Sequence, residues 1–261
     1  VVPITLIIDG KSYRDQVDIT SDEFFKVLKE VKELPTTSAV SPGQFEEAFR
    51  ELGKSSSDVV CIVLSKDLSA TYDSAILARD TIMKDMPDMN IEIVDSRSTG
   101  GGLGFVVLEA ARAAQSGKSS SEVIDVANNI IQNVKWIGAL DTLRYLVKGG
   151  RAPKAAGLVG ELLHIKPILG MFKHTGEVDM GGKERTTKKA IAGLLKMVKS
   201  EMDTSKPAHI IVHYSDDIKA GEHLKELVIA EFNCAEIYLS EFTPVMCCHT
   251  GPLVAIAFHS S

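Results

Sequence analysis

Hydroxyl side chains that could bind an anionic group gather in the segment LPTTSAVSPGQF, at residues 34–45. Thr37 and Ser38 can each donate a hydrogen bond to an ionised oxygen without a fixed counter-charge that would also trap small anions. Ser41 has a structural role, because proline follows it directly and glutamine follows three residues later, the pattern of a capped helix start. A role as turn or cap donors remains the alternative for Thr37 and Ser38.

A serine and a histidine elsewhere in the chain could also do chemistry. Ser69 lies in KDLSAT and His249 in CCHTGP, and such a pair can form part of a hydrolase. No G-x-S-x-G elbow occurs and no acidic third member can be chosen, so a Ser/His hydrolase is the weaker alternative. Ser69 could instead cap a helix that begins near residue 71, and His249 could be a hydrogen-bonded loop histidine.

The cysteines argue against disulfides and against a metal centre. They are too few and too irregularly spaced for a disulfide framework in 261 residues. The run Cys247-Cys248-His249 lacks the second ligand pair that zinc sites use. We therefore expect reduced, buried thiols and no metal site. The cysteines are Cys61, Cys234, Cys247 and Cys248.

A glycine-rich stretch and a basic stretch are the remaining motifs. Glycines before a helix can cradle phosphate, but STGGGLG, at residues 98–104, has neither the Rossmann nor the P-loop spacing. It predicts a closely packed turn or a backbone approach to a ligand. The segment LVKGGRAPK carries Lys148, Arg151 and Lys154, which either complement a helix dipole or form a docking surface for a partner. A small-anion or phosphosugar binder that uses the glycines with Arg151 remains an alternative function.

Composition excludes some classes of protein. The chain is 44% apolar and 25% charged, with a net charge of -6, which is ordinary for a globular protein and long enough for a sizeable core. The acidic balance speaks against a general binder of nucleic acid or anionic membrane. Since no run of 18 apolar residues and no signal-peptide pattern occurs, we expect a cytoplasmic protein without membrane insertion.

The first half of the sequence alternates between strand and helix patterns. VVPITLIIDGKSYRD predicts a hairpin with an Asp-Gly turn, and a capped helix follows. DVVCIVLS, at residues 58–65, is an apolar run suited to a strand buried on both faces. A helix is expected over about 71–86, then the strand IEIVDS and a helix through about 116. This order is typical of crossover units in a parallel or mixed sheet.

The second half repeats the alternation. VKWIGAL predicts a strand, and a hairpin is expected to turn around Thr175-Gly176. Helices are expected near 154–163, 184–202 and 217–231, with LVAIAFH as a last strand. The fold class is therefore α/β with two lobes, 1–133 and 134–261, each a sheet with flanking helices, and the ligand is expected between them.

Six segments carry a resemblance to a known family. In order they are LPTTSAVSPGQF, SKDLSATYDSA, IVDSRSTGGGLG, LVKGGR, HIKPIL and CHTGP. Their order and spacing, from residue 1 to about 258, resemble the DegV family of two-lobed α/β proteins that bind a long-chain fatty acid. The resemblance implies a carrier without a cofactor and without catalysis of its own. It also implies that the carrier presents the acid to a fatty-acid kinase for acyl phosphate formation.

The resemblance implies particular site residues as well. Thr37 and Ser69 match the hydroxyls that hold the carboxylate in the family, and His249 matches their histidine partner. Ser38 is the neighbouring candidate donor. A buried apolar tunnel would supply most of the affinity, since roughly a dozen methylenes at about 0.8 kcal/mol each give on the order of 10 kcal/mol.

The sequence departs from the family pattern in three places. Family members usually begin with another strand and a DST-like loop, which leads us to expect that the sequence is an incomplete copy of a longer chain. The usual SSGLSGTY is SKDLSATY here, and Ala70 restricts the backbone angles available beside Ser69. HTGPG is HTGPL, with Leu253 in place of a glycine. Both changes bear on the geometry around the head group of a bound acid.

Overall fold

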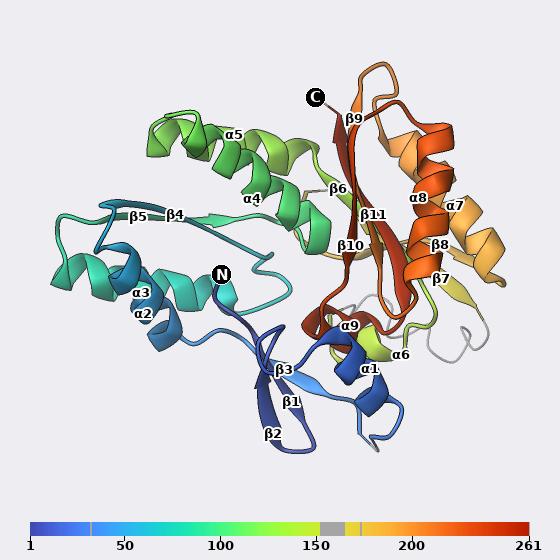
Figure 1. Cartoon of the computed structure of the whole chain (residues 1–261), viewed down its shortest axis with the longest axis horizontal. Helices are drawn as coiled ribbons and strands as arrows, with labels where there is room; N and C mark the ends of the chain where they lie inside the picture. The colour runs from blue at the N-terminus through green and yellow to red at the C-terminus, as the bar shows by residue number, and fades with distance from the viewer. Residues whose placement is uncertain (32, 152–164, 173, 261) are drawn as a thin grey trace.

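Three β-sheets and the helices packed on them make up the computed structural model, which describes residues 1–31, 33–151, 165–172 and 174–260. The sheets have two, three and six strands. They form two lobes, as expected, with the smaller sheets in the N-terminal half and the six-stranded sheet in the C-terminal half (Figure 1). The predicted boundary falls between helix α5, which ends at Asn133, and strand β6, which begins at Lys135; its exact position stays a prediction.

The N-terminal sheet is antiparallel and has the strand order β2-β1-β3. The predicted hairpin is confirmed, since Asp9 and Gly10 adopt positive φ angles of 47° and 76° between β1 and β2. Thr37 lies in β3 and pairs with Leu6 of β1. The strands are β1 (Thr5–Ile8), β2 (Lys11–Arg14) and β3 (Thr36–Ser38).

The two-stranded sheet lies between two pairs of helices (Figure 1). Its strands are parallel, as the apolar runs predicted. Helices α2 and α3 pack together on one side, and α4 and α5 pack together on the other. The elements are α2 (Pro42–Leu52), β4 (Asp58–Val63), α3 (Thr71–Asp85), β5 (Asn90–Asp95), α4 (Gly100–Gln115) and α5 (Ser120–Asn133).

The six-stranded sheet is mixed, in the order β10-β9-β11-β6-β7-β8. Strands β9 and β10 are parallel, the other pairs are antiparallel, and the predicted β7–β8 hairpin is confirmed. Helices α7 and α8 cover one face (Figure 1). The elements are β6 (Lys135–Leu140), β7 (Lys166–Met171), β8 (Asp179–Glu184), α7 (Thr187–Glu201), β9 (Ala208–Tyr214), α8 (Ile218–Glu231), β10 (Cys234–Glu241) and β11 (Leu253–Ser260).

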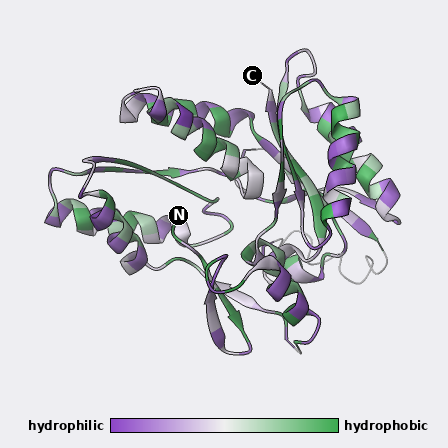
Figure 2. Ribbon diagram, viewed as in Figure 1, coloured by the Kyte–Doolittle hydropathy of each residue, from purple (hydrophilic) through white to green (hydrophobic). Residues whose placement is uncertain are grey.

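Helix α4 connects the two lobes, because it contacts β4 of the small sheet and β6, β9 and β11 of the large one. Its buried side chains, Phe105 and Val106 among them, join the core that contains Trp136, Ile211 and Ala257. Figure 2 shows apolar strands in the large sheet and helices with one apolar and one polar side. This burial of one face of each helix is what the helical spacing of apolar residues predicts.

Three shorter helices lie beside the N-terminal sheet, and α9 contacts α1, α6, β1 and β3. The predicted helix near 154–163 lies outside the described residues. None of the described helices is long and apolar enough to cross a membrane. The three helices are α1 (Ser21–Leu28), α6 (Arg144–Lys148) and α9 (Pro244–Thr250).

Candidate functional site

A pocket lies where β3, the loop before α3, the β6–β7 region and α9 meet. It contains about 730 Å³ of space outside protein atoms, a volume that includes open solvent at its mouth. Both halves of the chain contribute to its wall. The lining residues are Ile4, Thr37, Ala39, Leu64, Leu68, Ser69, Thr99, Trp136, Leu146, Arg151, Leu169, Val178, Val245, Met246, His249 and Thr250.

Thr37 and His249 lie together in the pocket wall. The distance from Thr37 Oγ1 to His249 Nε2 is 2.8 Å, a hydrogen bond whose donor depends on the histidine tautomer. If Nε2 carries the proton, it donates to Thr37, and the threonine hydroxyl proton is left to bind an acceptor in the pocket. The pair can therefore present a polar donor to an anionic group.

Burial sets the charge state of His249. It lowers the pKa of the imidazole to about 4, and the positive charge of Arg151 acts in the same direction. The ring is therefore neutral near pH 7. A Cβ at residue 149 would lie 2.9 Å from His249 Nδ1, so glycine at this position lets α6 approach the ring closely.

Ser69 lies in the same pocket, just before α3. Its Oγ is 2.8 Å from Thr71 Oγ1 and accepts a hydrogen bond of 3.3 Å from the Thr71 backbone N–H. Ser69 is not the N-cap residue of α3, because Ala70 holds that position and α3 has no side-chain cap. Neither bond reaches His249, whose Nε2 faces Thr37, so the Ser-His contact of a hydrolase is absent between these two residues.

Arg151 also lines the pocket, a position that sequence reasoning missed when it assigned this residue to partner docking. Its Nε donates to the Leu68 carbonyl at 3.3 Å and its Nη1 to the Gly149 carbonyl at 2.6 Å. The guanidinium is half-buried and brings a positive charge to a wall that otherwise has neutral donors. Gly150, with φ of 71°, makes the turn that returns the chain toward the pocket.

The other predicted site residues lie elsewhere. Ser38 is exposed, and its Oγ donates to the Ala39 carbonyl at 3.4 Å rather than lining the pocket. Its side chain follows Thr37 along a strand, where successive residues point to opposite faces. Lys148 is exposed at the end of α6. Lys154 lies outside the described residues.

The rest of the wall is largely apolar. Leu146, Leu169 and Val245 are buried side chains that line the pocket, and Trp136 adds a large ring. Trp136 Nε1 is buried without a hydrogen-bond partner among the described residues. A pocket with mostly apolar walls and a few polar side chains suits an amphiphilic ligand.

The glycine-rich segment is used for packing. The Gly101 backbone N–H donates to His213 Nε2 at 2.9 Å, and a Cβ at Gly101 would lie 2.4 Å from the same nitrogen. A Cβ at Gly102 would lie 2.0 Å from Ser98 Oγ. These contacts confirm the prediction of a closely packed turn.

Asp15 positions α9, and the sequence contained no signal for it. Its carboxylate accepts hydrogen bonds from Thr243 Oγ1 at 2.6 Å and from the Val245 backbone N–H at 3.2 Å. A carboxylate at the N-terminal end of α9 complements the helix dipole. Because α9 carries His249, this contact fixes one wall of the pocket to the N-terminal sheet.

The four cysteines are free, as predicted, but Cys61 and Cys234 are only partly buried. Cys248 lies beside His249 and donates to the Pro35 carbonyl at 3.0 Å, and burial raises its pKa to about 12. Cys247 is buried as well. Both thiols therefore act as small packing groups of α9.

Comparison with known proteins assigns the chain to a family. The model described as "Uncharacterised protein, DegV family" matches residues 1–261. The chain belongs to the DegV family. The family predicted from the six sequence segments is thereby confirmed.

Relatives from several bacteria match most of the chain. A DegV domain-containing protein of Caldanaerobacter subterraneus is 42% identical over 200 residues, which cover 77% of this chain and 69% of that protein. A DegV domain-containing protein of Streptococcus pyogenes is 32% identical over 259 residues, covering 98% of this chain and 89% of the relative.

Solved structures of fatty-acid-binding proteins share the fold. A Thermus thermophilus DegV family protein, described by its fatty acid binding, has a TM-score of 0.91 and 30% identity, with 100% of this chain and 91% of that chain covered. A stearic acid-binding protein of Eubacterium ventriosum has a TM-score of 0.89 and 27% identity, with 99% and 90% covered. The two-lobed α/β fold is thus that of the DegV family.

Proposed function

We propose that this DegV protein binds a long-chain fatty acid in the pocket, with the carboxylate held by Thr37, Ser69 and His249. The observation that carries the proposal is that these three side chains, from β3, the loop before α3 and α9, line one largely apolar pocket. Arg151 of the same wall supplies positive charge toward the head group. The fatty acid binding described for the Thermus thermophilus and Eubacterium ventriosum proteins supports this ligand class.

Two interactions contribute to the binding free energy: burial of the alkyl chain and hydrogen bonding of the carboxylate. Burial of roughly a dozen methylenes at about 0.8 kcal/mol each gives a gross term on the order of 10 kcal/mol. Each hydrogen bond to the ionised carboxylate adds about 1.5 to 3 kcal/mol. The apolar wall therefore supplies most of the affinity, and the hydroxyls and imidazole fix the orientation.

The test is the identity of the molecule that the protein carries. Purified protein is denatured and extracted with organic solvent, and the extract is analysed by mass spectrometry. We expect a fatty acid at close to one molecule per chain. No lipid in the extract, together with no binding of added fatty acid by delipidated protein, would contradict the proposal, and retention of a small phosphorylated compound would favour the anion-binder alternative.

We further propose that the bound acid is presented to a fatty-acid kinase, which forms the acyl phosphate. This step follows from the family resemblance. Lys148 supports it, because this exposed cation lies at the end of α6 beside the pocket-lining turn and its side chain is not part of the pocket wall. Catalysis would belong to the partner.

Charge reversal at Lys148 tests the presentation step. Lys148→Glu should leave fatty-acid affinity unchanged and lower acyl phosphate formation when a fatty-acid kinase from a DegV-containing bacterium is supplied. Lys118→Glu is the matched control, because Lys118 is an exposed lysine in the turn between α4 and α5. Equal acyl phosphate formation by both variants would contradict docking at Lys148.

A further inference from the structure

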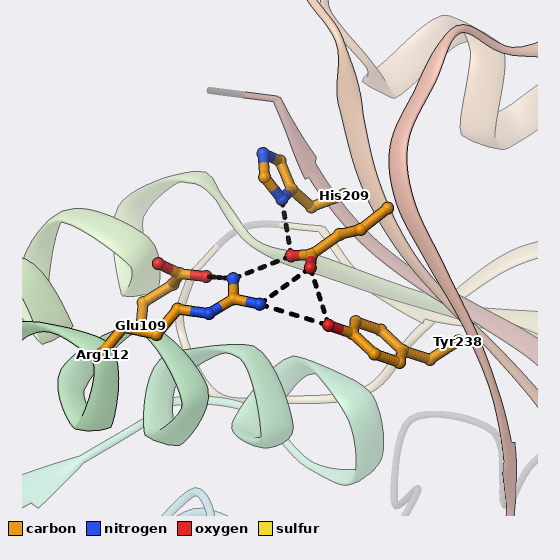
Figure 3. Close-up of polar contacts among 5 residues, drawn as sticks. Glu109, Arg112, His209 and Tyr238 are labelled. Carbon is orange, nitrogen blue, oxygen red and sulfur yellow. Dashed lines mark hydrogen bonds and ion pairs between the residues drawn. The ribbon is translucent and has the colours of Figure 1, made fainter. Parts of the chain in front are cut away.

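A second group of polar side chains lies where α4 crosses the large sheet, apart from the pocket-lining residues (Figure 3). The pairing of adjacent strands brings several of its members together. Glu236 of β10 is the register partner of His209 in β9, and His209 is the register partner of His259 in β11. The three residues therefore form one row across adjacent strands. Helix α4 contacts β9 and β11 and brings Glu109 and Arg112 to this row.

Hydrogen bonds hold most of the group in place. His209 Nδ1 is 2.7 Å from Glu236 Oε1. The two oxygens of Glu236 accept bonds of 2.9 and 2.8 Å from Arg112, which also contacts Glu109 at 2.6 Å. The Tyr238 hydroxyl donates to Glu236 at 2.7 Å. Arg112 accordingly keeps the pKa of Glu236 well below its usual range.

His259 is the exception within the group. Its side chain is almost completely buried, with 4% of the residue exposed, and Nε2 has no hydrogen-bond partner among the described residues. Its ring stacks on His209, with centroids 4.5 Å apart, and meets the edge of Phe105. A buried polar atom without a partner is costly. This nitrogen therefore points to a ligand other than the residues that the structure describes.

We propose that Glu109, His209 and His259 bind a divalent transition-metal ion, for which Zn²⁺ is the probe. One ligand atom from each residue lies within 4.8 Å of the others. Two imidazoles and one carboxylate are a known three-ligand set for zinc, with the fourth position open to water. Imidazole ligands also favour transition metals over Ca²⁺ and Mg²⁺, which take oxygen ligands.

The surroundings suit metal ligation. A histidine that ligates a metal commonly donates its other ring N–H to a carboxylate, and Glu236 accepts from His209 Nδ1 in this way. The two glutamates exceed Arg112 by one negative charge, which favours a divalent cation.

Binding requires small side-chain movements. With bonds of 2.0 to 2.2 Å, ligand atoms of a tetrahedral zinc ion are about 3.4 Å apart, so the three atoms must approach one another. The rings of His209 and His259 are parallel within 4° and must turn so that both lone pairs face the ion. Rotation about the last side-chain torsion of histidine is broad and inexpensive. The carboxylate of Glu109 exchanges its contact with Arg112 for the ion, and Arg112 keeps its two bonds to Glu236.

The ion would join α4 directly to two strands of the large sheet. Because α4 also contacts the small sheet, metal binding would stabilise the connection between the lobes. A ligand that binds only the folded state raises the unfolding midpoint. The site is therefore structural in its effect and independent of fatty-acid binding.

The test is a zinc titration of untagged full-length protein that has been treated with a chelator. Competition with a chromogenic chelator gives the affinity, and Co²⁺ reports the coordination geometry by its visible absorption. We expect one ion per chain, a higher Tm with Zn²⁺ and a tetrahedral Co²⁺ spectrum. Glu109→Gln removes a ligand from a partly exposed helix position and should weaken Zn²⁺ binding more than tenfold.

A second variant and two controls complete the experiment. Glu236→Gln keeps all three ligands but disturbs the support of His209, and should weaken binding about 10- to 100-fold. Glu47→Gln and His223→Gln change exposed residues outside the group and should leave binding unchanged. Absence of stoichiometric Zn²⁺ binding, or equal affinity in Glu109→Gln and the controls, would overturn the proposal.

Discussion

Thr37 and His249 are hydrogen-bonded at 2.8 Å although 212 positions separate them in the sequence. Strand β3 fixes the threonine by pairing with β1, and α9 carries the histidine against both strands. The bond therefore depends on the assembly of the N-terminal sheet with a helix from the far end of the chain. This convergence is what makes the pair a candidate head-group site.

Replacement of Thr37 by valine tests the role of its hydroxyl. Thr37→Val keeps the shape of the side chain and removes the donor, so fatty-acid affinity should fall about ten- to a hundredfold, the effect of one hydrogen bond to a charged group. Thr36→Val is the matched control, because Thr36 is an exposed threonine in the same strand. Titration of delipidated protein measures both, and equal affinities would exclude Thr37 from the site.

Loss of Asp15 should loosen α9. Asp15→Ala leaves Thr243 Oγ1 and the Val245 N–H without their acceptor, which should lower the unfolding free energy by about 1 to 3 kcal/mol. Since α9 carries His249, fatty-acid affinity should fall as well. Urea unfolding and lipid titration measure the two effects. The control is Asp88→Ala, at an exposed turn position, which should change neither the unfolding free energy nor the fatty-acid affinity. If Asp15→Ala behaves like this control, Asp15 does not position α9.

Two glycines of α4 should respond to alanine in opposite directions. A Cβ at Gly101 would lie 2.4 Å from His213 Nε2 and 2.8 Å from the Ala257 Cβ, so Gly101→Ala should destabilise the fold by about 1 to 3 kcal/mol. At Gly104 the nearest atom, Ile211 Cδ1, would be 3.6 Å away. Gly104→Ala should therefore stabilise the helix by up to about 1 kcal/mol. Thermal unfolding compares them, and similar shifts would contradict the packing described for Gly101.

Acid should destabilise the protein partly through His213. Burial lowers the pKa of this imidazole from 6.5 to about 4, so the unfolded chain binds its proton more readily than the folded one. The contribution of neutral His213 to the unfolding free energy is fully present above pH 6.5 and is lost as the pH falls toward 4. The unfolding free energy should decrease over this interval, by up to about 1.4 kcal/mol per pH unit from this residue.

His213→Gln provides the check on this pH dependence. Its unfolding free energy, measured by urea at several pH values between 7 and 4, should have a shallower slope than that of the unchanged protein. His223→Gln, which alters an exposed histidine of α8, should keep the original slope. Parallel slopes for all three proteins would show that His213 does not titrate differently on unfolding.

Local patterns explain which parts of the fold could be predicted from the sequence. The capping box predicted at Ser41 is formed, and so are boxes at Thr20 and Ser119, because each depends on residues within one helical turn. The short strand β3 was missed, since three residues carry little periodicity and the pairing with β1 is not local. The mixed order of the large sheet is likewise set by contacts between distant segments.

The candidate site, too, could be predicted only in part from the sequence. Thr37, Ser69 and His249 were predicted through a resemblance in order and spacing, and all three line one pocket. The pocket position of Arg151 was missed, because it depends on the turn at Gly150. The cluster of Glu109, His209 and His259 was not visible in the sequence, since one helix and two strands have to meet before the three residues become neighbours.

The most direct test of the account is the structure of the protein with a bound fatty acid, determined by crystallography with stearic acid added. We expect the carboxylate oxygens to lie within hydrogen-bond distance of Thr37 Oγ1 and Ser69 Oγ, with the alkyl chain against the apolar side chains of the pocket. A carboxylate that faces solvent away from Thr37 and His249, or a fatty acid bound at another site, would contradict it.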